Sequence, residues 1–108
     1  MIIVTTDNVS NYRVTETIGY VKGSTVQSKN IGRDILAGLK NIVGGEIKEY
    51  TEMMDDARKI AVARMVRDAE EKGANAIVGF RLVSSAIASN ASEIVAYGTG
   101  VKVSEVDY

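Results

Sequence analysis

The fold of this chain is decided by residues 50–83, which read YTEMMDDARKIAVARMVRDAEEKGANAIVGFRLV. Residues 51–72 contain neither glycine nor proline, and apolar side chains recur in them at spacings of three and four. That spacing is the period of one helix face, so the stretch predicts a single long helix. Gly73 follows the predicted helix end, where a left-handed conformation costs glycine nothing. A strand over Ala76–Val83 is expected to lie back against the helix.

The expected buried face of this helix is small and apolar. Its members are Tyr50, Met53, Met54, Ala57, Ile60, Ala61, Met65 and Ala69. Small side chains let a helix lie close to a sheet, and methionine fills irregular gaps. On the opposite face, opposite charges four residues apart predict two ion pairs, Asp55 with Lys59 and Arg64 with Asp68.

The remaining strands follow from β-branched and aromatic residues. Strands are expected over Ile2–Thr5, Tyr12–Val26 and Glu93–Glu105, and the last of these alternates between two faces. In the strand after Gly73, strict alternation would place Phe80 and Leu82 on the face of Val78. Ser84–Ser92 is small and polar, which predicts a loop or hairpin tip.

A second, shorter helix is expected between the second strand and the long helix. Asn30 suits its N-cap, apolar residues share one face from Ile31 to Val43, and Gly44-Gly45 ends it. The order β-β-α-α-β-β favours an α+β fold with a mostly antiparallel four-stranded sheet. Because one helix covers one sheet face, the short helix or another copy of the chain must cover the second.

Composition narrows the class of protein. The 108 residues predict a single domain spanning residues 1–108. The net charge of −1 argues against nucleic-acid or membrane-surface binding. There is no Cys and no His, so the commonest soft-metal ligands and the commonest general base are missing. Without a signal peptide or a long apolar run, a cytoplasmic protein is expected.

Three motifs resemble one known family: RDILAGLKNIVGG at residues 33–45, GANAIVG at residues 73–79 and YGTGV at residues 97–101. Nearly the whole chain resembles the YbjQ family, small bacterial and archaeal proteins labelled heavy-metal-binding. The resemblance implies a dodecin-like α+β subunit that assembles into a homopentameric ring, with a decamer of paired rings as an alternative. It implies no established cofactor and no catalytic residues.

Acidic side chains gather where the long helix begins. The candidate hard-cation ligands are Glu49, Glu52, Asp55 and Asp56. Carboxylates suit Ca²⁺, Mg²⁺ or Mn²⁺, so a divalent cation is the cofactor that this group would hold. The alternative interpretation is that the helix dipole alone favours acids at this end.

A second candidate site is an anion site at the start of the short helix, where free N–H groups and an arginine could grip a ligand. Its residues are Ser28, Lys29, Asn30, Arg33 and Asp34. Helix capping and an ion pair to a neighbouring subunit would explain the same residues. Arg81, a charge on a small and apolar strand, is a further ligand candidate and is expected to pair with Glu93 or with an acid of another chain.

These observations predict a non-enzymatic homo-oligomeric ring that binds a small ligand or a hard cation between subunits. Two alternatives stay open. One is the heavy-metal-binding protein of the family label, although Cys and His are missing. The other is an enzyme with a carboxylate and arginine site composed across the interface.

Overall fold

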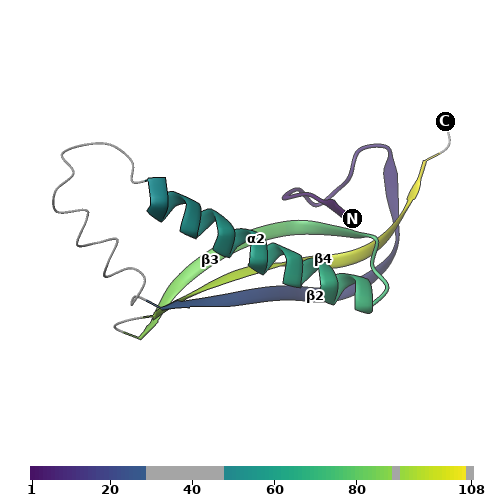
Figure 1. Cartoon of the computed structure of the whole chain (residues 1–108). Helices are drawn as coiled ribbons and strands as arrows, with labels where there is room; N and C mark the ends of the chain where they lie inside the picture. Colours follow the sequence, from purple (N-terminus) through teal and green to yellow (C-terminus); the bar gives the residue numbers. More distant parts are fainter. Residues whose placement is uncertain (29–47, 89–90, 107–108) are drawn as a thin grey trace.

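The structure is a computed structural model that describes residues 1–28, 48–88 and 91–106. In chain order the elements are β1 (Ile2–Ile3), β2 (Tyr12–Ser28), α2 (Lys48–Glu71), β3 (Ala76–Ala88) and β4 (Ala91–Glu105). The predicted α+β class is confirmed, because α2 lies across one face of a four-stranded sheet ordered β1-β3-β4-β2 (Figure 1). β1 pairs parallel with β3, and the other pairings are antiparallel. The predicted short helix falls outside the described residues.

The long helix predicted over residues 51–72 is present as α2, which begins at Lys48 and ends at Glu71. Gly73 follows it with a φ of 90°, as the sequence predicts for a residue that ends a helix. The buried row consists of Ala57, Ala61, Met65 and Ala69. The prediction was wrong for Ile60, which is exposed, because the helix turns this side chain away from the row of residues that faces the sheet.

Small residues let α2 approach the sheet closely. A Cβ built on Gly23 of β2 would lie 2.6 Å from the carbonyl carbon of Arg64, and closer still to backbone atoms of Ala61 and Met65. Ordinary van der Waals contacts of a Cβ are 3.4–4 Å. The helix backbone therefore rests directly on the strand at Gly23, and no side chain could be inserted there.

β4 alternates as predicted, with Ile94 and Ala96 in the core beneath α2 and Val101 and Val103 in the core on the opposite face. We call the first side the helix face and the opposite side the far face. Because antiparallel partners point to the same side, the register assigns the residues of β2 and β3 to these two faces.

The predicted faces of β3 were wrong beyond Val78. The register shifts between Val78 and Arg81, so two residues of β3 stand opposite one residue of β4. Gly79 occupies this bulge with a φ of 63°, a conformation that glycine adopts without strain. The extra residue reverses the alternation, so Phe80 packs into the core under α2 and Leu82 lies on the same face.

Of the two alternatives predicted for Ser84–Ser92, the long loop was wrong, and the segment belongs to the end of the β3-β4 hairpin. β3 continues to Ala88 and β4 begins at Ala91, so most of these small residues are paired with a neighbouring strand. Ser85 stands opposite Glu93 and Ala86 opposite Ser92. Cross-strand pairing thus outweighs the weak strand preference of serine and alanine.

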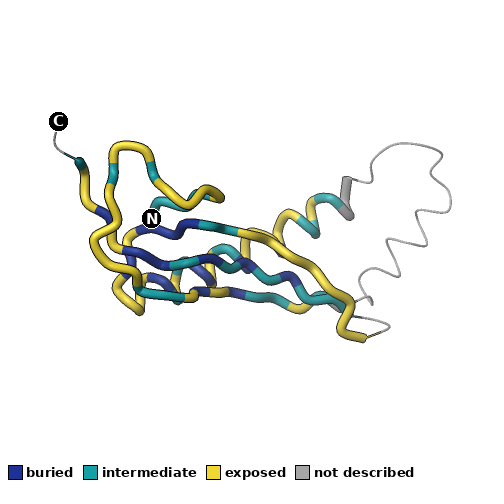
Figure 2. Tube along the Cα trace, turned by 180° about the vertical axis from the view of Figure 1, so that it is seen from behind, coloured by how far each residue is buried: buried dark blue, intermediate teal, exposed yellow. Residues whose placement is uncertain are grey.

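The N-terminal segment covers one end of the far face, a cover that the sequence did not reveal. Ala76, Val78, Val101 and Val103 form a second core on this face, and Ile2, Val4, Val9 and Tyr12 pack against it. At the other end β3 is exposed from Arg81 to Ala88 (Figure 2). The sheet is therefore enclosed on both faces at one end only.

Candidate functional site

The predicted anion site lies almost wholly outside the described residues. The side chain of Ser28 and all of Lys29, Asn30, Arg33 and Asp34 lie outside the described residues. The site therefore stays a prediction.

The acidic candidates lie in the first turns of α2. The side chain of Glu49 is outside the described residues, and Glu52, Asp55 and Asp56 are described. Asp55 accepts a hydrogen bond at 3.0 Å from Nη1 of Arg58, three residues later, instead of pairing with Lys59 as predicted. Among the described residues, no three acidic side chains gather closely enough to hold a metal ion.

Arg81 joins the N-terminal segment to the sheet. Its Nη1 donates hydrogen bonds to the carbonyl oxygens of Thr5 at 3.0 Å and of Phe80 at 2.7 Å. The predicted pairing with Glu93 was wrong within the chain, because the bulge places Ser85 opposite Glu93 and Tyr97 opposite Arg81. Arg81 therefore fastens the covering segment beside the bulge.

A hollow of about 190 Å³ opens between the first half of α2 and the distal part of β3. It is lined by Met54, Arg58, Leu82, Val83, Ser84 and Ile94. The lining combines apolar side chains with one guanidinium and one hydroxyl. Such a surface suits an apolar group that carries an acceptor, and the hollow is large enough for one large side chain or a small ring.

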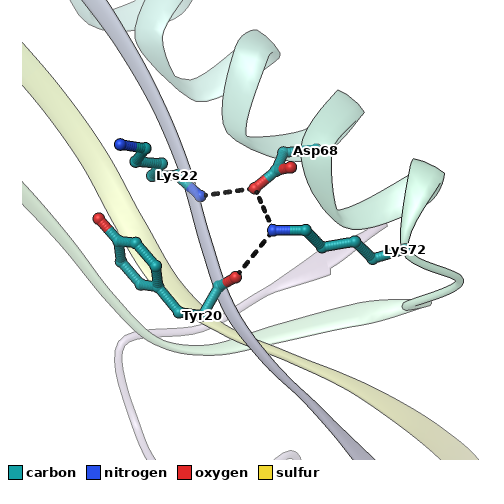
Figure 3. A network of polar contacts seen from close by, with 4 residues as sticks. All are labelled: Tyr20, Lys22, Asp68 and Lys72. Atoms are coloured by element: carbon teal, nitrogen blue, oxygen red, sulfur yellow. Dashed lines mark hydrogen bonds and ion pairs between the residues drawn. The ribbon is translucent and has the colours of Figure 1, made fainter.

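A row of polar side chains on α2 closes the outer edge of β2 (Figure 3). The amide of Lys22 donates to Oδ2 of Asp68 at 3.0 Å, and Nζ of Lys72 donates to the carbonyl oxygen of Tyr20 at 3.1 Å. Lys72 also contacts Asp68 at 3.1 Å, which replaces the predicted pair of Asp68 with Arg64. These side chains satisfy backbone groups that an edge strand would otherwise leave open.

Arg64 extends the same row by donating to the carbonyl oxygen of Ser24 at 2.6 Å. The side chains of α2 can follow the edge of β2 because the spacing along the helix matches the spacing along the strand. Residues four apart on a helix rise about 6.0 Å, and residues two apart on a strand rise about 6.6 Å. Steps of four along α2 therefore keep pace with steps of two along β2, and each side chain reaches the next outward-facing backbone group.

The electrostatics of this edge act on Asp68. The hydrogen bond from the Lys22 amide lowers the pKa of the Asp68 carboxyl below its usual value. Partial burial acts in the opposite direction, and the Lys72 ammonium lowers the pKa again. The carboxylate is therefore the stable form in the folded chain, and it holds β2 against α2.

Sequence reasoning identified Arg64 and Asp68 only as a possible ion pair. The spacing of four that continues to Lys72 was present in the sequence, and it is the signal that could have revealed the row. Its partners are backbone atoms of β2, which carry no side-chain signature. Only the placement of the strand beside the helix identifies them.

Within the described residues, no helix is both long and apolar enough to cross a membrane. The chain matches, over residues 1–104, the YbjQ family, whose description reads "Putative heavy-metal-binding".

Two similar proteins carry the family name UPF0145. A UPF0145 protein of Halalkalibacterium halodurans is 65% identical over 95% of this chain and 97% of its own length. One of Thermotoga maritima is 55% identical over 98% and 100%. A crystal structure of a protein of unknown function from the DUF74 family of Pediococcus pentosaceus has a TM-score of 0.64 at 14% identity, covering 96% of this chain and 98% of that one. This last likeness supports the fold alone.

The family match over nearly the whole length and the high identity to full-length relatives agree with the motifs at residues 33–45, 73–79 and 97–101. The chain therefore belongs to the YbjQ family.

Proposed function

We propose that this chain is a non-enzymatic subunit that assembles with copies of itself into a ring. One observation carries the proposal: beyond the N-terminal cover, the far face of the sheet exposes large apolar side chains. Tyr20 is 59% exposed, Val26 57% and Val83 47%. Their register partners lie in neighbouring strands on the same side, so they belong to one surface. Lys22, Ser24 and Glu93 share this face with them, and large exposed apolar side chains among polar ones are characteristic of an interface.

The finer features that the family resemblance implies belong to this proposal. They are the dodecin-like subunit, the homopentameric ring, the alternative decamer and the cytoplasmic location. A small ligand bound between subunits would meet the hollow beside Met54, where Arg58 and Ser84 offer polar contacts. A hard cation would have to be held by the acidic side chains at the start of α2.

The heavy-metal description of the family does not fit this chain. Soft metal ions select thiolate and imidazole ligands, and the sequence contains no Cys and no His. Carboxylates remain, but the described ones do not gather into a group that could bind a metal. We therefore assign no step of the function to a heavy metal.

The proposal is tested by native mass spectrometry of protein purified without chelator, which reports stoichiometry and retained ligands together. A monomer at micromolar concentration would contradict it. Tyr20→Glu and Val26→Glu place a charge on the far face and are expected to shift the protein toward monomer. Ala63→Glu is the matched control, since Ala63 is exposed on α2 and the change in charge is the same. Equal stoichiometry in all three variants would exclude the far face as the interface.

A further inference from the structure

The two long edges of the sheet are protected to different degrees. Along β2, side chains of α2 cover the edge from Tyr20 to Ser24. Register shifts between Val14 and Glu16 and between Thr17 and Gly19 interrupt the part of the strand before Tyr20. Bulges and covering side chains are devices by which edge strands avoid pairing with other chains. The edge of β2 is therefore closed to an added strand from Val14 to Ser24.

The opposite edge is open along the distal part of β3. The N-terminal segment pairs with β3 only as far as Phe80, whose amide donates to the carbonyl oxygen of Val4 at 3.0 Å. Beyond it, Leu82–Ala88 has no neighbouring strand on that side in the part of the chain that the structure describes. The segment reads LVSSAIA, with no charged residue, no proline and no glycine. A register shift between Ala86 and Ala88 interrupts its last residues. Within the described residues, Leu82–Ala86 therefore has none of the usual protections of an edge strand.

The register identifies which backbone groups this edge presents. The backbone amide of Lys22 points toward α2 and away from β4. The backbone groups of its partner Tyr97 therefore point away from β2 and toward β3, where Tyr97 pairs with Arg81. Backbone groups alternate in direction along an antiparallel strand, so the residue after Arg81 points away from β4, and so does every second residue after it. The outward groups belong to Leu82, Ser84 and Ala86.

We propose that this edge pairs with the same edge of a second copy, antiparallel and around a two-fold axis at Ser84. The inference rests on the proposed self-assembly and names one contact within it. A five-fold ring has no two-fold axis between its subunits, so this contact belongs to the alternative decamer, where it joins the two rings. The segment is complementary to itself in this register. Leu82 stands opposite the partner's Ala86, and Val83 opposite the partner's Ser85, so within Leu82–Ala86 each large side chain meets a small one. No two like charges are brought together.

A second copy fits this edge better than other occupants. Within the described residues, its β2 is closed from Val14 to Ser24 by the covering row and the bulges, so Leu82–Ala86 of β3 is the longest stretch of edge that it leaves open. The hollow next to Leu82 and Ser84 lies beneath the position of the added strand, which would cover it from the open side. Two-fold pairing is also self-limiting, because it consumes both open edges and leaves none for a third chain.

Ser84→Pro tests the contact with little effect on the subunit. The amide of Ser84 points outward, so its loss removes no bond to β4, whereas a proline blocks the approach of another strand. Light scattering is expected to show half the wild-type mass, with an unchanged circular dichroism spectrum. Ser84→Thr is the matched control and is expected to keep the wild-type mass.

Ser84→Cys gives an independent readout that does not depend on tolerating proline. The chain has no cysteine, so a single one forms a disulfide only with another copy. Partners across a two-fold ladder have Cα atoms about 5.5 Å apart, within disulfide reach. Under mild oxidation, Ser84→Cys is expected to give a covalent dimer, and Thr17→Cys on the β2 edge is expected to give little.

The outcomes separate this inference from the proposed function. Two results together would overturn the two-fold contact: a wild-type oligomer that keeps its mass in Ser84→Pro, and equal cross-linking in Ser84→Cys and Thr17→Cys. Both would leave self-assembly intact. A monomeric wild type overturns both. In the double variant Ser84→Cys with Thr17→Cys, a disulfide between position 84 of one copy and position 17 of another would replace the two-fold contact by a head-to-tail one.

Discussion

Gly23→Ala is the substitution for which the structure predicts the largest effect of a single methyl group. The added Cβ would lie 2.6 Å from the carbonyl carbon of Arg64 and would overlap backbone atoms of Ala61 and Met65. Ordinary contacts are 3.4–4 Å, so α2 must retreat by about 1 Å. The obstacle is helix backbone, which cannot rotate away as a side chain could. Overpacking of this kind costs about 2–4 kcal/mol, a large part of the stability of a small domain.

The assay is thermal unfolding followed by circular dichroism at one fixed protein concentration. At about 4–8 °C per kcal/mol for a domain of this size, Gly23→Ala is expected to lower the Tm by about 8–32 °C. Gly79→Ala is the control: its Cβ would meet no atom within 4 Å, and only the φ of 63° opposes it. That conformation costs alanine about 1–2 kcal/mol. The reasoning is refuted if Gly23→Ala melts within about 4 °C of wild type, or if Gly79→Ala loses more.

Three further predictions concern the edge row, the core and the metal label. The folded state lowers the pKa of Asp68, so its stabilisation is full above the unfolded pKa near 3.8 and disappears as the pH falls through the lower folded value. Asp68→Asn is therefore expected to cost about 1 kcal/mol at pH 7 and to weaken the loss of stability below about pH 4 in melts from pH 2 to 7, whereas identical acid profiles would contradict the role of the carboxylate. Met65→Ala empties a fully buried position beneath the sheet and should lower the free energy of unfolding by about 2–5 kcal/mol in urea titrations; a cost below about 1 kcal/mol would mean that α2 does not pack as described. Calorimetry with Zn²⁺, Cu²⁺ and Cd²⁺ is expected to show no binding tighter than about 10 μM, and a tighter site would restore the metal function that the ligand chemistry argues against.

Local periodicity was sufficient for part of the fold. The long helix followed from apolar spacings of three and four, and its end followed from Gly73, because the residues of one helix turn interact directly with one another. The alternation of β4 was also readable, since a strand that is packed on both faces shows its pattern within a few residues. The buried row of small residues predicted a helix lying close to a sheet, and Gly23 is the point of closest approach.

The sequence by itself determined the long helix, the presence of four strands and their order along the chain, and the membership of the YbjQ family. The tertiary structure decided which side chains share a face and which edge is closed. One extra residue at Gly79 reverses the direction of every following side chain in β3, and no local preference announces where a bulge will form. The closed edge likewise depends on Asp68 and Lys72, which bind backbone groups of a strand distant in the chain. Every residue carries such backbone groups, so the sequence does not show which of them will be bound.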